Sequence, residues 1–172
     1  MTRAYCNSMD WDSRYRAGEA PAEPHRLVVE AAQMLSPGNA LDLACGAGRN
    51  ARYLAQRGWM VTAVDLSVAA LHLARMPRIV LADLERNAIP FRAGLFDFVL
   101  IINFLHEPLF ADALRVLRRG GAIAAAIRTI GNYSLPPSTL RNHFAGCRIV
   151  VEHESEIVAI KNSEAPERSA SA

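Results

Sequence analysis

The chain has 172 residues, of which 51% are hydrophobic, and a formal net charge of +2. This length predicts one domain with a sizeable core, and the near-neutral charge gives no support for nucleic-acid binding. No apolar stretch approaches the roughly 18 residues of a membrane span, and no secretory signal is expected. Cys6, Cys45 and Cys147 are few and widely spaced, which favours free thiols and a cytoplasmic location.

The N-terminal part predicts an irregular segment followed by a helix. Residues 1–23 are polar and contain Gly18 and Pro21, so we expect no regular structure there. Pro24 suits the first turn of a helix that would run to about Leu35. The turn-forming residues 36–39 would then end this helix before the first strand.

Residues 40–67 are the most informative part of the chain. They predict a strand over 40–44, a glycine turn, a helix over 50–57 and a strand over 60–64 that ends at Asp65. Gly46 and Gly48 leave the turn without side chains, and the helix start offers backbone N–H groups to a ligand. Asp65 follows Gly46 by about 19 residues, where a carboxylate can accept hydrogen bonds from ribose hydroxyls. The unit therefore predicts a site for a nucleoside-containing cofactor.

The remaining sequence predicts alternating helices and strands that close with a hairpin. Ser67 would cap a helix through Arg75, and the apolar run 96–103 is typical of a central parallel strand. Gly120 and Gly121 would end a helix that carries three arginines near its C-terminus. The other expected elements are a strand over 79–82, a loop over 83–94, a helix over 108–117, a strand over 122–129, a helix over 140–144 and strands over 148–153 and 156–161.

The glycine turn alone does not identify the cofactor. Residues 46–51 also fit the dinucleotide pattern G-x-G-x-x-G/A, so a nicotinamide-binding Rossmann protein is one alternative. Asp42, just before the turn, would repel a pyrophosphate but suits the ammonium and sulfonium groups of S-adenosylmethionine. Asp83 supplies a further acid after the third strand, and no tyrosine is followed by a lysine four residues later. These observations favour S-adenosylmethionine.

Four segments resemble the class I S-adenosylmethionine-dependent methyltransferases. They are Trp11–Tyr15, Asp42–Asn50, Val64–Ser67 and Phe96–Val99 leading to Asn103. The likeness is greatest to the small bacterial enzymes grouped with the tellurite-resistance and thiopurine methyltransferases. Ala44 departs from the pattern, because it stands where the family often has a glycine, and it predicts a tighter turn.

The resemblance implies an α/β fold, a Rossmann-like three-layer sandwich around a seven-stranded, mostly parallel sheet whose last strand is antiparallel. It also implies three parts: an N-terminal cover segment over 1–23, a methyltransferase domain over 24–162 and a disordered tail over 163–172. Because the carboxyl ends of parallel strands share one edge of the sheet, the acids and Asn103 are expected to converge there.

Roles for single residues also follow from the resemblance. The glycine turn would face the methionyl part of the cofactor, Asp42 would hold its ammonium group directly or through water, and Asp65 would bind the ribose hydroxyls. Leu66, Asp83 and Leu84 would contact adenine, and two aromatic residues would cover the cofactor. The implied cofactor-binding residues are Trp11, Tyr15, Asp42, Ala44, Gly46, Gly48, Asn50, Asp65, Leu66, Asp83, Leu84 and Asn103. Singly, Asp42 and Asp83 could also be strand-end caps, and Trp11 a surface aromatic.

Methyl transfer by in-line displacement depends mainly on alignment of the reacting atoms. A thiolate or a selenium or tellurium oxyanion needs no general base, whereas an oxygen or nitrogen acceptor can require one. His106 is the best candidate for a catalytic base, and its alternative role is that of a helix-start histidine bonded to backbone. Arg14 and Arg128 could bind an anionic acceptor in substrate-binding roles.

The stretch 129–140 is too short to build a docking surface for protein or RNA, which favours a small-molecule acceptor. The histidines do not cluster at ligand spacing, so we expect no metal. We also expect a monomer or weak dimer with no nucleic-acid or membrane partner. A non-catalytic S-adenosylmethionine-binding protein is the second alternative, because Ala44 is unusual and no base is obvious.

Overall fold

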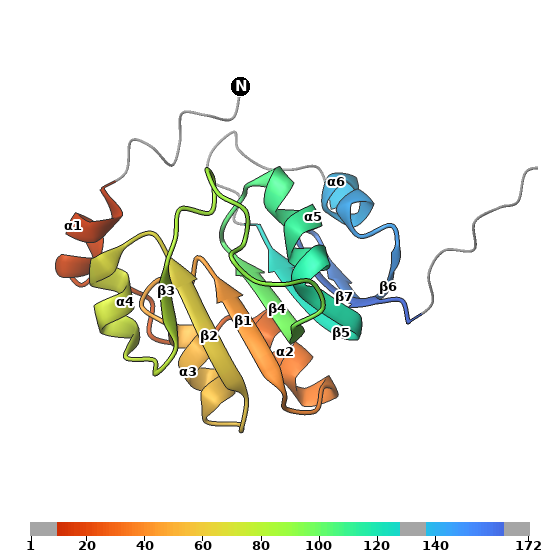
Figure 1. Cartoon of the computed structure of the whole chain (residues 1–172), viewed down its shortest axis with the longest axis horizontal. Helices are drawn as coiled ribbons and strands as arrows, with labels where there is room; N and C mark the ends of the chain where they lie inside the picture. Colours follow the sequence, from red (N-terminus) through yellow and green to blue (C-terminus); the bar gives the residue numbers. More distant parts are fainter. Residues whose placement is uncertain (1–9, 128–136, 164–172) are drawn as a thin grey trace, which may run out of the picture.

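The computed structural model describes residues 10–127 and 137–163, which form one sheet flanked by helices (Figure 1). The seven strands lie in the order β3-β2-β1-β4-β5-β7-β6. Their bounds are β1 (Asn39–Leu43), β2 (Met60–Asp65), β3 (Ile79–Leu81), β4 (Phe96–Ile102), β5 (Leu117–Ala126), β6 (Cys147–His153) and β7 (Glu156–Lys161). The helices are α1 (Trp11–Arg16), α2 (Arg26–Met34), α3 (Arg49–Ala55), α4 (Val68–Ala74), α5 (Glu107–Val116) and α6 (Pro137–His143).

The strand pairing confirms the predicted sheet. β1 pairs in parallel with β2 and with β4, and the β2–β3 and β4–β5 pairs are also parallel. β7 runs antiparallel to both β5 and β6, so the last strand is the one that reverses direction within the described sheet. The chain order of the strands changes direction between β1 and β4. Ligands in such sheets bind beyond the carboxyl ends of the strands at this point.

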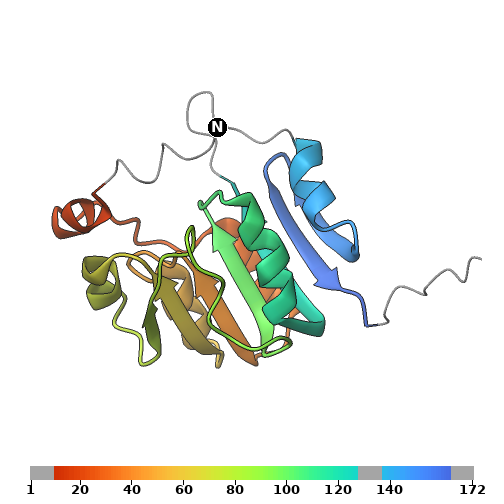
Figure 2. The same cartoon turned by 45° about the horizontal axis from the view of Figure 1, so that its top comes forward.

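Helices cover both faces of the sheet and give it the predicted three layers (Figure 2). α2, α3 and α4 pack on one face, over side chains that include Phe98 and Leu100 of β4. α5 and α6 pack on the other face, over Val99 and Ile101 of the same strand. Alternate residues of β4 therefore enter opposite cores, which explains why its sequence is apolar throughout.

The N-terminal segment contains a helix that the sequence analysis did not predict. α1 begins after Asp10, whose Oδ1 accepts a hydrogen bond from the Ser13 N–H at 3.1 Å. α1 also packs against α4. The expectation of an irregular segment over 1–23 is therefore wrong for residues 11–16. A side-chain cap satisfies the first turn, and a tertiary contact supplies the stability that six residues alone lack.

The start of α2 also differs from the prediction. Pro24 precedes the helix instead of lying in its first turn, and His25 is the capping residue. The His25 Nδ1 atom accepts a hydrogen bond from the Leu27 N–H at 3.3 Å. An imidazole at this position replaces the hydroxyl or carboxylate that usually caps a helix, so common capping signals do not reveal it.

The boundary between α5 and β5 is the third difference. The helix ends at Val116 and β5 begins at Leu117, so Arg118 and Arg119 lie on a strand and not at a helix end. The pairing of β4 with β5 is irregular between Phe96 and Phe98. Gly120 and Gly121, which were expected to end the helix, lie in this part of β5 instead. The other predicted elements are present with boundaries shifted by a few residues.

Candidate cofactor site

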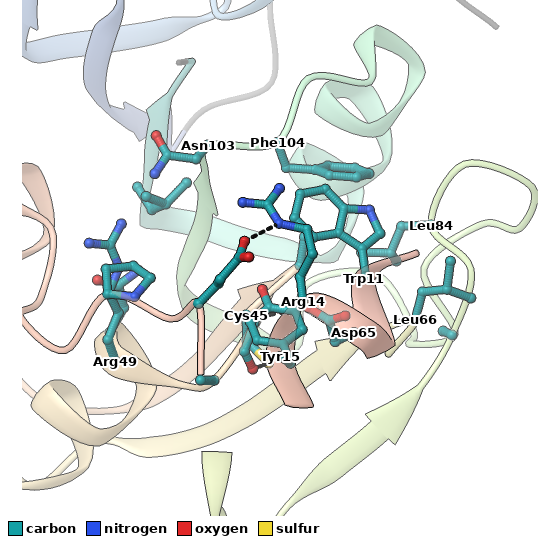
Figure 3. Close-up of a pocket in the computed structure, with 18 of the residues that line it drawn as sticks. Trp11, Arg14, Tyr15, Cys45, Arg49, Asp65, Leu66, Leu84, Asn103 and Phe104 are labelled. Carbon is teal, nitrogen blue, oxygen red and sulfur yellow. Dashed lines mark hydrogen bonds and ion pairs between the residues drawn. The ribbon is translucent and has the colours of Figure 1, made fainter. Parts of the chain in front are cut away.

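A cavity of about 240 Å³ opens beyond the carboxyl ends of β1, β2 and β4 (Figure 3). Its walls come from α1, from the turn between β1 and α3, and from residues that follow β2, β3 and β4. Ten of the predicted cofactor-binding residues line it: Trp11, Tyr15, Ala44, Gly46, Asn50, Asp65, Leu66, Asp83, Leu84 and Asn103. The convergence expected from the parallel topology is therefore present, although Asp42 and Gly48 do not line the cavity.

The two glycines of the turn are required for different reasons. Gly46 has a φ of +55°, and a Cβ atom there would collide with the hydroxyl group of Tyr15. Gly48 has a φ of +75°, and a Cβ there would lie 2.7 Å from the Cβ of Ala74 at the end of α4. Gly46 thus lets a ligand or a covering side chain approach the backbone, whereas Gly48 permits close packing of α3 against α4.

Backbone strain gathers at the rim of the cavity. Ala44 has a φ of +53° and Asn103 has a φ of +59°, and both lie just beyond the ends of strands that border the cavity. A left-handed backbone is unfavourable for alanine and better tolerated by asparagine. Ala44 therefore adopts the conformation that the more usual glycine would adopt without strain.

Asp65 joins the two turns that face the cavity. Its Oδ2 atom accepts a hydrogen bond from the Gly46 N–H at 2.7 Å, and its Oδ1 atom accepts one from the Ser67 N–H at 2.9 Å. Burial raises the pKa of Asp65, while these backbone hydrogen bonds act in the opposite direction. Each carboxylate oxygen can accept more than one hydrogen bond, so the group could still bind ribose hydroxyls.

Asp42 lies in β1 and is only 1% exposed. Burial, and then the nearby charge of Asp65, raises the pKa of Asp42 to about 7. Its Oδ2 atom has no hydrogen-bond partner within the part of the chain that the structure describes. A buried acid with an unpartnered oxygen behind the glycine turn fits a cationic ligand. Because Asp42 does not line the cavity, its predicted contact with an ammonium group would have to be indirect.

The three residues predicted to contact adenine line the cavity. Leu66 and Leu84 line the cavity, and Leu66 exposes 55% of its surface even though it is apolar. Asp83 lines the same wall, but its Oδ1 atom accepts hydrogen bonds from the N–H groups of Glu85 at 3.0 Å and Arg86 at 3.3 Å. Asp83 thus also serves as the cap that the sequence analysis kept as an alternative.

Residues of α1 form the outer wall of the cavity. The rings of Trp11 and Tyr15 are 6.3 Å apart, and the guanidinium group of Arg14 lies 5.2 Å from the centre of the Trp11 ring. Arg14 also forms an ion pair of 2.8 Å with Glu19 (Figure 3). Burial raises the pKa of Tyr15 to about 12, so its hydroxyl stays protonated near neutral pH.

The remaining predicted residues are divided among several places. Asn50 borders the cavity, but its buried Oδ1 atom accepts a hydrogen bond of 2.8 Å from the His25 N–H and so connects the starts of α2 and α3. His106 precedes α5 and lines a second cavity of about 270 Å³ together with Asp112. Arg128 lies outside the described residues.

Arg49 was not identified from the sequence, although it lines the cavity at the first residue of α3. Its Nη1 atom donates to the backbone oxygen of Glu23 at 3.1 Å, and burial lowers the pKa of Arg49. Its position directly after the glycine turn was the sequence feature that could have predicted its place in the cavity lining. A half-buried cation there is well placed for the carboxylate of an amino-acid moiety.

Cys45 also lines the cavity, in the glycine turn itself. Burial, followed by the charges of Asp42 and Asp65, strongly raises the pKa of this thiol. A thiol that stays protonated is a poor nucleophile, which supports its interpretation as a small filling residue.

The described residues contain no group of three or more His, Cys, Asp or Glu side chains that could hold a metal ion. None of the described helices is long and apolar enough to cross a membrane.

The sheet order, the glycine turn after β1 and the acid at the end of β2 define a class of protein, namely Rossmann-like domains of the class I methyltransferase type. Residues 41–125, from β1 into β5, match the family described as "Methyltransferase domain". The chain carries a methyltransferase domain of the class I S-adenosylmethionine-dependent type. S-adenosylmethionine is the cofactor of this class, and the unpartnered oxygen of Asp42 and the carboxylate of Asp65 fit it.

Curated relatives agree with this family. Malonyl-[acyl-carrier protein] O-methyltransferase of Salmonella typhimurium is 38% identical over 105 residues, which cover 56% of this chain and 40% of the relative. The probable S-adenosyl-L-methionine-dependent methyltransferase TehB of Haemophilus influenzae is 43% identical over 61 residues, which cover 36% of this chain and 20% of TehB. Hemagglutinin 1 of Eikenella corrodens is 31% identical over 113 residues, or 65% of this chain and 36% of the relative. The chain thus matches about half or less of the length of these relatives.

Solved structures show the same fold. TehB from Haemophilus influenzae has a TM-score of 0.69 at 18% identity, with 88% of this chain and 66% of TehB covered. The 1,6-didemethyltoxoflavin-N1-methyltransferase of Burkholderia thailandensis, solved with S-adenosylhomocysteine, has a TM-score of 0.64 at 20% identity. That comparison covers 89% of this chain and 86% of the other.

The strain at Ala44 leads to a stability prediction. Replacing Ala44 with glycine should stabilise the protein by about 0.5–1 kcal/mol, because glycine adopts a positive φ without a Cβ clash. Thermal unfolding followed by circular dichroism should show a rise in Tm of about 1–4 °C. An unchanged or lower Tm would show that the Ala44 methyl group contributes packing that offsets the strain.

The burial of Asp42 predicts a pH-dependent effect of Asp42→Asn. The folded-state pKa of about 7 lies above the ordinary value of 3.8, so the folded protein holds more protons between these pH values. The free energy of unfolding of the wild type should therefore fall as pH rises from about 4 to 7. Asparagine is neutral throughout, so at pH 8 the variant should be more stable by on the order of 2 kcal/mol.

Urea unfolding of both proteins at pH 5 and pH 8 measures this difference. The advantage of the variant should be smaller at pH 5, where the wild-type carboxyl group is already protonated. Equal pH slopes for the two proteins would contradict the assignment. S-adenosylhomocysteine should bind the variant more weakly, because the negative charge behind the glycine turn is lost.

Proposed function

We propose that the protein is an S-adenosylmethionine-dependent methyltransferase whose acceptor is a small molecule with a soft nucleophile, such as a thiolate or a selenium or tellurium oxyanion. The observation that carries the proposal is the carboxylate of Asp65, held at the cavity by the N–H of Gly46 from the glycine turn. Bound S-adenosylmethionine supplies an electrophilic methyl group. Every other requirement falls on the residues that bind and align the two reactants.

Different residues of the cavity would bind different chemical groups of the cofactor. Asp65 would accept hydrogen bonds from the ribose hydroxyls, and Leu66 and Leu84 would sandwich the adenine. Arg49 would pair with the methionyl carboxylate beside the open backbone of Gly46. Asp42 would favour the cationic groups through its charge. These assignments use residues that border the cavity, except for Asp42.

The protonation states in the cavity support a soft acceptor. Tyr15, with a pKa of about 12, and Cys45, whose pKa is raised strongly by burial, are protonated at neutral pH, and no histidine lines this cavity among the described residues. The acids of the lining are Glu19, Asp65, Asp83 and Glu85, and the first three already accept hydrogen bonds from the protein. His106 lines the neighbouring cavity instead. An acceptor that is already anionic near neutral pH would need no base from the protein.

Two arginines line the cavity and would contact an anionic acceptor. Arg14 and Arg49 come from opposite walls, α1 and the start of α3, and share the lining with four acids (Figure 3). If Arg49 binds the cofactor carboxylate, Arg14, which is paired with Glu19, would supply positive charge for the acceptor on the other wall. Arg128, predicted to do the same, lies outside the described residues, so its role stays a prediction.

Cofactor binding is tested by isothermal titration of S-adenosylhomocysteine into the wild type and Asp65→Ala. Loss of a charged acceptor for the ribose hydroxyls should weaken binding roughly 10- to 100-fold. Glu30→Ala, an exposed acid of α2, is the control and should bind like the wild type. Circular dichroism verifies that Asp65→Ala is folded, since the residue also bonds two turns. A wild type that binds NADH but not S-adenosylhomocysteine would refute the proposal.

Acceptor chemistry is tested by following S-adenosylhomocysteine release with small thiols, selenite, tellurite and carboxylates. The rate with a thiol should rise with pH until the thiol itself is ionised, near pH 8.5 for an ordinary thiol, because the protein supplies no base. A plateau set by a group of the protein near pH 6–7, abolished in His106→Gln, would instead identify His106 as the base. Binding without turnover of any acceptor would favour the non-catalytic alternative.

A further inference from the structure

α1 is hydrogen-bonded to the start of α4 through one acidic side chain. Asp12 Oδ1 accepts hydrogen bonds from the Ser67 hydroxyl and from the Ala69 N–H, the latter at 3.2 Å. No residue of α1 is fully buried, and its half-buried Trp11 and Tyr15 rings line the cavity, so these polar contacts contribute to holding the helix in place. The hydrogen bond from Ser67, and then that from Ala69, lowers the pKa of Asp12, which keeps it charged at neutral pH.

Ser67 connects this contact to the cofactor site. Its N–H donates to Asp65 Oδ1 at 2.9 Å, and its hydroxyl oxygen accepts from the Ala70 N–H at 3.1 Å. The hydroxyl proton is therefore available for Asp12. A continuous set of hydrogen bonds runs from Asp12 through Ser67 to Asp65, and from Asp65 to the Gly46 N–H at 2.7 Å.

Helix spacing gives α1 two faces with different tasks. Trp11 and Tyr15 are four residues apart, so they lie on one face of the helix, and both line the cavity. Asp12, one position after Trp11, points toward α4 instead. Asp12 thus fixes the rotation and height of the helix, and these determine where the two aromatic rings lie over the cavity.

We propose that Asp12 is a positioning residue that couples the seating of α1 over the cavity to cofactor binding at Asp65. The inference rests on the proposed function and adds a role that the cavity lining does not reveal, because Asp12 itself does not line the cavity. Cofactor that orders Asp65 also orders Ser67, and Ser67 holds Asp12. A seated α1 in turn places Trp11 and Tyr15 against the cofactor.

The size of the effect follows from population arithmetic. When only a fraction of molecules has α1 seated, the apparent dissociation constant equals the intrinsic value divided by that fraction. Asp12→Asn keeps one acceptor oxygen but removes the charge that strengthens both hydrogen bonds. We expect the affinity for S-adenosylhomocysteine to fall roughly 5- to 10-fold, because charge-assisted hydrogen bonds are about twice as strong as neutral ones.

The experiment compares Asp12→Asn with Arg16→Gln. Arg16 forms an ion pair of 3.1 Å with the other oxygen of Asp12, within α1, and it does not line the cavity. If Asp12 acted only by stabilising α1 through this pair, both variants would weaken binding equally. Positioning through α4 predicts that Arg16→Gln binds S-adenosylhomocysteine within about twofold of the wild type.

Tryptophan fluorescence gives a readout that a merely structural role would not change. Trp59 is 5% exposed in the core, whereas Trp11 lies on α1, so acrylamide quenching reports mainly on α1. S-adenosylhomocysteine should protect Trp11 from quenching in the wild type and in Arg16→Gln. In Asp12→Asn the protection at saturating ligand should be smaller. With an accepted acceptor, KM for S-adenosylmethionine should rise in this variant more than kcat falls.

The outcomes separate the two proposals. A wild type that does not bind S-adenosylhomocysteine defeats the proposed function. A wild type that binds it, with Asp12→Asn equal to it in affinity and in quenching, defeats the role of Asp12 and leaves the proposed function intact. A lower Tm for Asp12→Asn with unchanged affinity and quenching would show a purely structural contact and also overturn the inference.

Discussion

The structure depends on one carboxylate that bonds two backbone turns at once. Asp65 ends β2 and accepts hydrogen bonds from Gly46, at the start of the glycine turn, and from Ser67, the cap of α4. The two helices that follow these turns begin at fixed positions because of it. Gly48 then allows α3 and α4 to touch, since a side chain there would meet Ala74. The geometry of the cavity floor is therefore set by interactions that would exist without any ligand.

Buried acids and left-handed backbone conformations, both unfavourable, gather at the cavity, where a bound ligand would offset them. Asp42 and Asp65 are both buried. The charge of Asp65 raises the pKa of Asp42, and both charges raise the pKa of Cys45. Ala44 and Asn103 hold left-handed backbones at the rim. Strain and uncompensated charge usually persist in proteins only where function requires them. A cofactor with cationic groups would compensate the two acids, which explains why the sequence tolerates them.

The sequence predicted the features that depend on local pattern and topology. The apolar runs, the glycine turn and the spacing of Asp65 are all read along the chain, and the parallel topology then brings the strand ends together. What it could not predict depends on tertiary contacts. α1 is too short to form by propensity and needs its contact with α4. His25 caps α2 with an imidazole, which common capping signals do not predict. His106 lines the second cavity, and this position depends on the path of the chain into α5. The capping role of Asp83 is local, but its place on the cavity wall is not.

The chemistry left to the cavity is mainly a matter of alignment. Tyr15 and Cys45 are held in their protonated forms by burial, and no histidine lines the cavity, so the described lining offers no phenolate, thiolate or imidazole as a base at neutral pH. Rate must then come from holding an already reactive nucleophile in line with the methyl group and the sulfur, and misplacement by about 1 Å can cost a factor on the order of 100. That requirement makes α1 important, because this helix supplies a wall of the cavity although none of its residues is fully buried. A site that relies on alignment, bordered by a helix attached through polar contacts, is controlled by whatever holds that helix in place.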